Sequence, residues 1–500
     1  MNLSIDTARG TDRAVIVAVR SAERCAAPRY DWRSDRRRYK LTASEQNTTP
    51  TVHAEPPLAA GRAPAQLSGW KCLLIAMLAT AVGCGPKPTE PTRPAPTREP
   101  PPPAVTEQPA PPIDPIQLQE QAVTELEAGN FATALQLIRR AKRAAPEDPD
   151  VIYLMARILA ERNRFGEAIK MLDDLAESAP ATRLPSLGQT AEWLVHQGSW
   201  QEAERRYRLL LDEVDDTTLV DHMLAQLLLR QGRRLEATPH LRKLCRQGNV
   251  MESSLRSLLT IAIPFPADAT SEEFDPIGAL GHARAKISQG NFEEALEWLD
   301  PVTANEAKEF SLRGRIYAQQ LDFDSLEKWA ADPLPDSAES TADYWFAQGV
   351  LQAHQGNHRQ AVKSFCEVVR RDITDQHAYR AMAGSLEQLD AQDESREALQ
   401  RAELIQQTHE IGSKLAAGQQ NDVRAVTELA ELLAELHRPL ETLGWRAIQV
   451  YYGRMSQSIT EETATQAMNE INRDRMQVIN DGVASPSQPF ILCGVDPEKL

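Results

Sequence analysis

Apolar residues recur at helical spacing along most of this chain, and residues 148–180 show the pattern clearly. One apolar stripe, with positions three or four residues apart, comprises Ile152, Leu154, Met155 and Ile158. After a turn at Phe165, a second stripe comprises Ala168, Leu172 and Leu175. Pro180 ends this second stretch because proline cannot donate a hydrogen bond to a carbonyl one turn earlier. The pattern therefore predicts two short amphipathic helices joined by a turn.

The same pair of helices recurs with a period near 34 residues. Its clearest marker is a series of alanines spaced 34, 35 and 34 residues apart: Ala134, Ala168, Ala203 and Ala237. Each follows a turn of similar composition, such as Gly129-Asn130-Phe131. A period of this length is typical of helix-turn-helix units that stack into a solenoid.

This unit resembles the tetratricopeptide repeat, in which bulky, small, glycine, aromatic, alanine and proline positions follow a fixed order. The first copy matches at Leu118, Ala122, Gly129, Phe131, Ala134, Ile138, Ala141 and Pro146. The third copy matches at Leu187, Ala191, Gly198, Trp200, Ala203, Tyr207 and Leu210. The resemblance implies an all-α fold, a solenoid of helical hairpins in which each repeat contacts its neighbours.

Weaker copies extend the resemblance over roughly residues 114–455, the last being a degenerate copy between Asn421 and Tyr452. Proline and aspartate residues interrupt the helical pattern at residues 264–275. We therefore expect two lobes, residues 114–263 and residues 276–455, joined by this break.

Residues 456–500 form the expected C-terminal region. An amphipathic pattern predicts a helix over residues 460–479, and Asn480-Asp481-Gly482 then predicts a turn. The apolar stretch 489–495 is read as a strand or an irregular tail.

The chain is acidic overall, with a formal net charge of −16. Residues 1–71 are instead basic, because they hold 12 Lys and Arg against 7 Asp and Glu. An acidic solenoid is poorly suited to nucleic acid, since contact with phosphates requires basic patches. Solubility alone accounts for the charge. Of the 6 cysteines, Cys245 and Cys366 lie on apolar helix faces and are read as small core residues.

Residues 70–84 form the longest apolar stretch of the sequence, and they end in Ala81-Val82-Gly83-Cys84. A basic residue, an apolar core and a small-residue exit are the parts of a secretory signal peptide. The exit resembles a bacterial lipobox, although Ala81 stands where leucine is more usual. This resemblance implies that Cys84 becomes the first mature residue and carries lipid. Residues 85–113 are rich in proline, which predicts an extended, semi-rigid linker.

Residues 1–69 precede this signal segment and are rich in arginine without a helical pattern. We expect them to be disordered, and we interpret them as a mis-called start, with translation beginning near Leu67 or Ser68. The protein would then be lipid-anchored in the bacterial envelope, in the periplasm or at the outer membrane. If the leader is genuine, the apolar segment is internal and a cytoplasmic location follows.

No catalytic pattern is found in the sequence, which has no HExxH, no CxxC and no GxSxG motif. His354 and His358 are four residues apart, but Gly356 lies between them at a repeat turn, which argues against a metal site. We therefore expect no enzymatic activity, no cofactor, no metal and no small-molecule substrate.

The family resemblance also implies which side chains face a partner, because the first helix of each repeat lines a concave groove in that family. The corresponding positions here give seven candidate contacts: Tyr153, Arg157, Glu192, Gln226, Arg284, Phe346 and Arg380. A subset of the family binds C-terminal carboxylates with an asparagine that every copy here lacks. Mixed apolar and arginine side chains suit an extended or helical peptide segment.

The sequence thus predicts a non-enzymatic protein–protein interaction scaffold that is tethered to a membrane and binds peptide segments of partner proteins. The alternative is the recognition arm of a larger enzyme or β-propeller protein whose other domain is absent from this chain.

Overall fold

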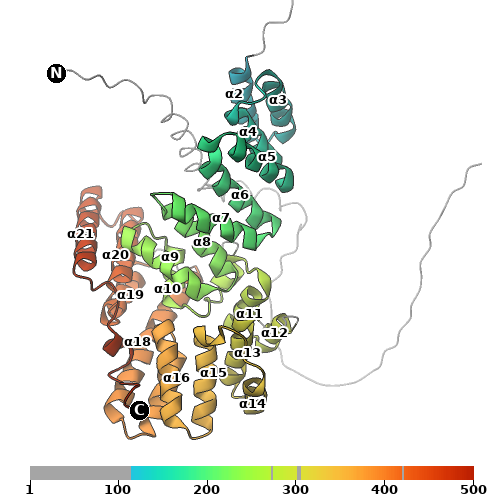
Figure 1. The fold of residues 1–500 in the computed structure, drawn as a ribbon. Helices are drawn as coiled ribbons and strands as arrows, with labels where there is room; N and C mark the ends of the chain where they lie inside the picture. The colour runs from blue at the N-terminus through green and yellow to red at the C-terminus, as the bar shows by residue number, and fades with distance from the viewer. Residues whose placement is uncertain (1–113, 272–273, 301–305, 419–421) are drawn as a thin grey trace, which may run out of the picture. The chain divides into compact units, whose positions relative to one another are not determined.

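Helix follows helix in the computed structural model, which describes residues 114–500 except 272–273, 301–305 and 419–421 (Figure 1). The first eight helices are α2 (Pro115–Glu127), α3 (Phe131–Ala144), α4 (Pro149–Ala160), α5 (Phe165–Ser178), α6 (Arg183–Gln197), α7 (Trp200–Glu213), α8 (Thr218–Arg230) and α9 (Arg234–Gln247). The next six are α10 (Glu252–Leu259), α11 (Gly278–Ser288), α12 (Phe292–Leu299), α13 (Ala307–Gln320), α14 (Phe323–Ala331) and α15 (Ala342–His354). The last seven are α16 (His358–Arg371), α17 (Gln376–Glu387), α18 (Gln392–Ala416), α19 (Val423–Glu435), α20 (Pro439–Met455), α21 (Glu461–Asn480) and α22 (Gln488–Ile491). The described residues contain no β-strand, so the predicted all-α fold is confirmed.

Consecutive helices pack as hairpins along the chain. The pairs are α2–α3, α4–α5, α6–α7, α8–α9, α11–α12, α13–α14, α15–α16, α17–α18 and α19–α20. The last pair lies where the degenerate copy was expected, between Asn421 and Tyr452. Helix α10 has no such partner and stands between two runs of hairpins.

The alanines that mark the repeat lie where neighbouring helices touch. Ala134, Ala168, Ala203 and Ala237, on the second helices of their hairpins, are all 0% exposed. The small residues on the first helices, Ala122, Ala156, Ala191 and Ala225, are also 0% exposed. A larger side chain there would force the helices apart, which explains why alanine recurs with the period. Cys245 and Cys366 are likewise buried, as predicted.

Polar side chains before several helices define where these helices begin. The Asp148 carboxylate accepts hydrogen bonds from the backbone N–H groups of Asp150 and Val151, at 2.9 and 3.4 Å. The Thr341 hydroxyl accepts one from Tyr344 N–H at 3.2 Å. Such caps satisfy backbone donors that have no partner within the helix.

Glycine ends a helix where the backbone must turn into the left-handed region. Gly232, after α8, has φ of +72°, and a Cβ there would lie 2.8 Å from the carbonyl oxygen of Leu280. Only glycine meets both demands, so this residue fixes the close approach of α8 to α11.

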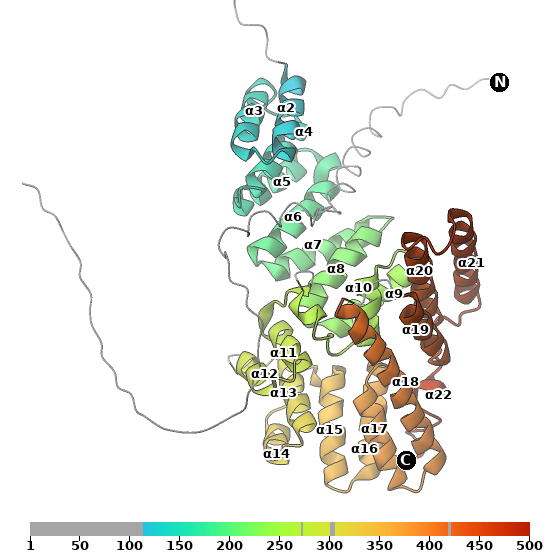
Figure 2. The same ribbon diagram turned by 180° about the vertical axis from the view of Figure 1, so that it is seen from behind.

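The later helices return to contact α9 and α10. Helix α10 packs against α18 and α20, and α20 also contacts α9 (Figures 1 and 2). The Tyr452 hydroxyl donates a hydrogen bond to the Glu252 carboxylate across this contact. Within residues 264–275, the described part includes the short 3₁₀ helix Asp268–Thr270.

The C-terminal region is helical. Helix α21 covers the stretch for which an amphipathic helix was predicted. The stretch 489–495, read from the sequence as a strand or an irregular tail, instead forms the short helix α22 and a turn.

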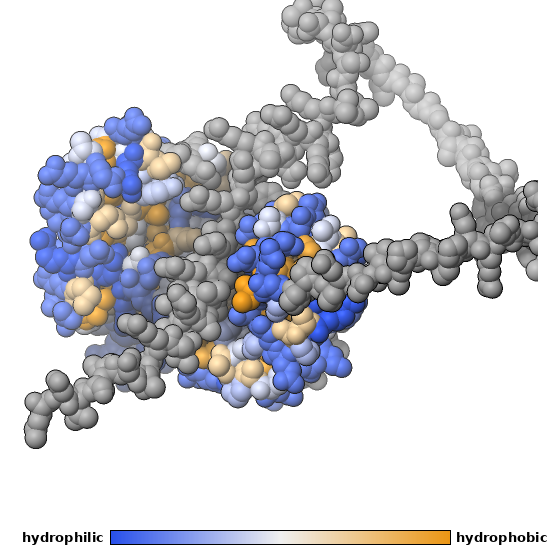
Figure 3. Space-filling model, turned by 90° about the horizontal axis from the view of Figure 1, so that it is seen from above, coloured by the Kyte–Doolittle hydropathy of each residue, from blue (hydrophilic) through white to orange (hydrophobic). Residues whose placement is uncertain are grey.

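The residues that the structure describes form one compact unit. The predictions for the leader 1–69, the signal segment with Cys84 and the linker 85–113 concern residues outside the described part. On the face drawn in Figure 3, hydrophilic residues dominate and hydrophobic residues form small scattered patches.

Candidate binding site

Two adjacent first helices, α4 and α6, carry a row of hydrogen-bonded polar side chains. The Tyr153 hydroxyl donates to Gln189 Oε1 at 3.4 Å. The Gln189 amide then donates to Glu192 Oε2 at 2.9 Å. Arg157 follows Tyr153 by four residues and therefore shares its face of α4. All four side chains are half-buried. The structure thus brings together Tyr153 and Glu192, two of the predicted contact residues.

Gln189, which links these two residues, was not among the predicted contacts. In the third copy, the position equivalent to Tyr153 is Gly188, one residue before Gln189. The one sequence signal for Gln189 is its position three residues before Glu192 on the same helix.

The Glu192 carboxylate lies in a partly desolvated environment. Burial raises its pKa above the usual value. The positive charges of His196 and Arg157 act in the opposite direction without cancelling this effect. Burial of the Tyr207 hydroxyl on α7, and after it the negative charge of Glu192, raises the pKa of Tyr207. A half-buried carboxylate of this kind can accept hydrogen bonds from a partner at low desolvation cost.

Helix α8 continues the series of first helices. Gln226 is half-buried there, one turn after His222. Burial lowers the pKa of His222, so its ring is neutral near pH 7. Gln226 therefore stays a predicted contact next to a neutral imidazole.

Arg284 and Phe346 occupy a different environment, because both are buried in the interior at 7% and 4% exposure. Arg284 donates to the carbonyl oxygens of Gly232 and Ala262 at 2.8 and 2.9 Å and forms an ion pair with Asp343. The Phe346 ring packs on Phe365, with ring centroids 6.3 Å apart. Neither side chain is available to a partner in this structure, so we leave both out of the proposed binding surface.

Arg284 is buried against an internal stretch of chain, residues 258–262, which we call the central segment. Its carbonyl groups receive hydrogen bonds from side chains of distant helices. Arg438 donates to Leu258 O at 2.7 Å, and His409 donates to Leu259 O at 2.9 Å. Burial lowers the pKa of His409 to about 4, so this neutral ring donates through its Nε2–H. These two carbonyls are at the end of α10, where helices lack internal partners.

Two more carbonyls and one N–H group of the central segment are bound by side chains outside it. Arg234 donates to Thr260 O and Ile261 O at 2.9 and 3.0 Å. The backbone N–H of Ile261 donates to the Thr374 hydroxyl at 2.9 Å. Side chains from both runs of repeats therefore converge on this segment and bind these backbone groups.

A buried ion network adjoins the central segment through Arg284, which binds both Asp343 and the carbonyl of Ala262. Arg315, 2% exposed, lies 2.7 Å from Asp375 and 3.4 Å from Asp343. Its guanidinium also lies 4.3 Å from the centroid of the Phe346 ring. Burial and the charge of Asp375 raise the pKa of the neighbouring Asp372. These charges hold the interior together and are closed to a partner.

Arg380, the last predicted contact, is exposed on α17. Its guanidinium donates to Gln406 and lies 3.9 Å from Glu403. It is separate from the row on α4 and α6 and stays a predicted contact.

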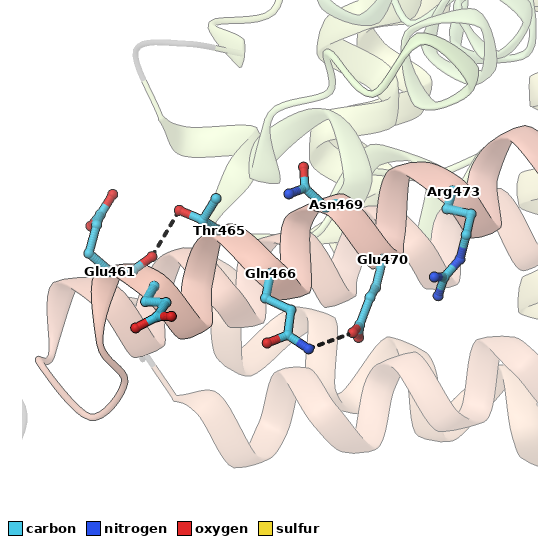
Figure 4. A pocket seen from close by; sticks show the side chains of 7 residues that line it. Glu461, Thr465, Gln466, Asn469, Glu470 and Arg473 are labelled. Carbon is cyan, nitrogen blue, oxygen red and sulfur yellow. Dashed lines mark hydrogen bonds between the residues drawn. The ribbon is translucent and has the colours of Figure 1, made fainter.

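A hollow on the outer side of α21 is lined by Glu461, Glu462, Thr465, Gln466, Asn469, Glu470 and Arg473 (Figure 4). The Gln466 amide donates to Glu470 Oε1 at 3.1 Å. Its walls come from one helix and carry no large apolar side chain, so it offers little to hold a ligand.

Two further searches cover the described residues alone. Among them, no group of three or more His, Cys, Asp or Glu side chains is placed to hold a metal ion. Within the same ranges, no helix has both the length and the apolar character needed to cross a bilayer.

These helical hairpins define a helical-repeat protein. Residues 125–187 match the family described as tetratricopeptide repeat, from the end of α2 into α6. The solved structures that resemble this chain include a tetratricopeptide repeat protein from Parabacteroides merdae, at 14% identity and a TM-score of 0.24, covering 54% of this chain and 98% of that one. They also include the TPR2AB domain of yeast Sti1, at 12% identity and a TM-score of 0.24, covering 72% of this chain and 98% of that one. Because these values are low, the fold rests on the hairpins themselves.

Proposed function

We propose that this chain is a non-enzymatic scaffold that binds segments of partner proteins on the first helices of its N-terminal hairpins. The row Tyr153–Gln189–Glu192 carries the proposal, because it joins the first helices of two adjacent repeats. One partner segment can therefore contact both repeats at once. The family match over residues 125–187 supports this role.

The chemistry of the row indicates how a partner segment would be held. Glu192 accepts hydrogen bonds, whereas Gln189 can both donate and accept. An extended or helical segment offers backbone and side-chain groups to such a row. A hydrogen-bond donor of the partner that replaces water at the desolvated Glu192 carboxylate would contribute most to the binding free energy.

The test compares two variants with the same chemical change. Glu192→Gln removes the charge from the row, and Glu177→Gln removes one from the exposed face of α5. Crosslinking and pull-down from native membranes would measure partner capture, with circular dichroism as the check on folding. We expect roughly tenfold less capture for Glu192→Gln, the worth of a charged hydrogen bond, and no change for Glu177→Gln. Equal capture by both variants would reject this surface.

We also propose that lipid on Cys84 tethers the scaffold to a membrane of the bacterial envelope, with residues 85–113 as the spacer. The support is the order of the sequence, in which the apolar segment, the cysteine and the proline-rich linker follow one another. Cys84→Ser should move the protein from the membrane fraction to the soluble fraction. Detection by mass spectrometry of native peptides from residues 31–62 would show that the leader is translated and would defeat this proposal.

A further inference from the structure

A short stretch after α21 packs against helices that lie more than one hundred residues earlier. This stretch, Gln488–Val495, is called the C-terminal segment below. The Tyr379 hydroxyl on α17 donates a hydrogen bond to the backbone carbonyl of Ile491 at 3.0 Å. Helix α22 also contacts α16. Both the backbone and the side chains of the segment are therefore engaged.

Phe490 is the most distinctive contact of this segment. Its ring lies 4.0 Å from the His437 ring, and the two planes differ by only 7°. The Arg401 guanidinium lies 3.2 Å from the centroid of the Phe490 ring. Arg401 is 6% exposed, and its nearest acidic partner, Glu397, is 3.9 Å away. The aromatic ring thus covers a buried cation whose ion pair is long, an arrangement in which a cation–π contact is favourable.

The apolar residues that follow Phe490 are buried in turn. Ile491, Leu492, Cys493 and Val495 are between 0% and 7% exposed. Gly494 and Asp496 are exposed between and after them. The segment therefore presents an aromatic residue and four small or medium apolar side chains to one surface.

The connection from α21 to this segment makes few contacts, although Ala484 within it is half-buried and packs against the core. Most of residues 481–487 are exposed. In the part of the chain that the structure describes, residues 483–486 make no hydrogen bond, and Asp481 and Gly482 bond only to the last turn of α21. The segment can therefore leave its surface without disturbing α21, as expected of a locally independent unit.

We propose that the surface formed by Tyr379, Arg401, His437 and α16 is a docking site for a short apolar peptide with an aromatic residue, which the C-terminal segment occupies in cis. The matching partner is a protein segment with the same chemistry, an aromatic side chain followed by aliphatic ones. Such a partner binds when it displaces the resident segment. This site is separate from the row on α4 and α6 and does not depend on it.

The experiment uses the full chain with a protease recognition sequence inserted between Gly482 and Ser485. The protein is folded and purified first and is then cleaved in this exposed connection. The probe is a fluorescent peptide with the sequence of residues 487–499, and fluorescence anisotropy reports its binding. We expect saturable binding to the cleaved chain, at least tenfold tighter than to the uncleaved chain, where the tethered segment competes at a high effective concentration.

Substitutions in the probe and in the surface test the contacts. A probe with Phe490→Ala should bind at least tenfold more weakly, while one with Glu498→Gln, at an exposed position, should bind unchanged. Tyr379→Phe keeps the ring but loses the hydrogen bond to Ile491, so we expect a roughly two- to tenfold loss in affinity for the normal probe.

Three results would overturn the proposal. Cleavage could cause the helical signal to collapse, or the cleaved chain could stay folded without exchanging its segment for the probe. The Phe490→Ala probe could also bind as well as the original. Each result would mean that the C-terminal segment is a fixed part of the core.

Discussion

On α4 and α6, the side chains expected to face a partner are half-buried and hydrogen-bonded to one another, whereas on α11 and α15 their counterparts are buried in the interior. Tyr153 and Glu192 meet through Gln189, and both remain at the surface. Arg284 instead binds the carbonyl of Ala262, a residue of this same chain. Equivalent positions of the repeat thus lie at the surface in one region and bind the chain itself in the other.

This difference teaches what the repeat pattern does and does not specify. It specifies the direction in which a side chain points from its helix. What lies in that direction depends on the rest of the chain, here the central segment. Backbone carbonyls without helical partners need donors, and arginine supplies several in a fixed geometry. An arginine side chain that is suited to binding a peptide can equally bind an internal stretch of its own chain.

The largest expected loss of stability comes from breaking the buried ion network in the second of these regions, that of α11 and α15. Arg315→Ala leaves the buried Asp375 without its cation, whereas Asp343 keeps its ion pair with Arg284, and this should cost about 3–5 kcal/mol of the free energy of unfolding. Urea denaturation followed by circular dichroism would measure it. Arg396→Ala, which breaks an exposed ion pair with Asp393, should cost less than about 1 kcal/mol. Similar losses for the two variants would contradict the central role of the network.

A smaller effect is expected from one hydrogen bond to the central segment. Thr374→Val keeps the shape of the side chain but removes the hydroxyl, which accepts from Ile261 N–H and donates to Asp372 Oδ1 at 2.6 Å. A buried N–H without a partner costs about 1–3 kcal/mol, measurable by the same denaturation experiment. Thr465→Val, on the exposed face of α21, serves as the control and should change stability by less than about 0.5 kcal/mol. A loss no greater than that of the control would show that the central segment does not need this donor.

The helical hairpins could be predicted because they depend on local signals that repeat. Buried alanines such as Ala168 and Ala203 recur wherever helices touch, and proline or glycine marks the turns between them. The α4–α6 row was predicted in part for the same reason, since Tyr153 and Glu192 occupy regular positions of the pattern. Gln189 was missed because its contact depends on how far α6 is rotated against α4, which no single repeat encodes.

The interior of the second region could not be predicted in this way. Residues 258–262 carry no repeat pattern, and two of their partners, His409 and Arg438, are 150 and 180 residues away in sequence. The contact of the C-terminal segment with Tyr379 is of the same kind. Contacts that occur only once, between distant parts of a chain, leave no periodic signal in the sequence.

The smallest expected loss of stability concerns Glu202 on α7, in the N-terminal hairpins, where the charges are more exposed. Glu202 on α7 accepts hydrogen bonds from Arg205 at 2.7 and 2.8 Å and from Arg206 at 3.1 Å. These bonds, above all those from Arg205, lower the pKa of Glu202 from 4.5 to about 2. Because the folded state favours the ionised carboxylate, its contribution to stability is complete above pH 4.5 and is lost as the pH falls through about 2. Glu202→Gln should therefore cost less than about 1 kcal/mol at pH 7, and the difference from the unsubstituted chain should shrink as the pH falls. Urea denaturation of both proteins from pH 7 down to the lowest pH at which they fold would measure it, and a difference that stays constant with pH would show that this carboxylate is not held by its arginines.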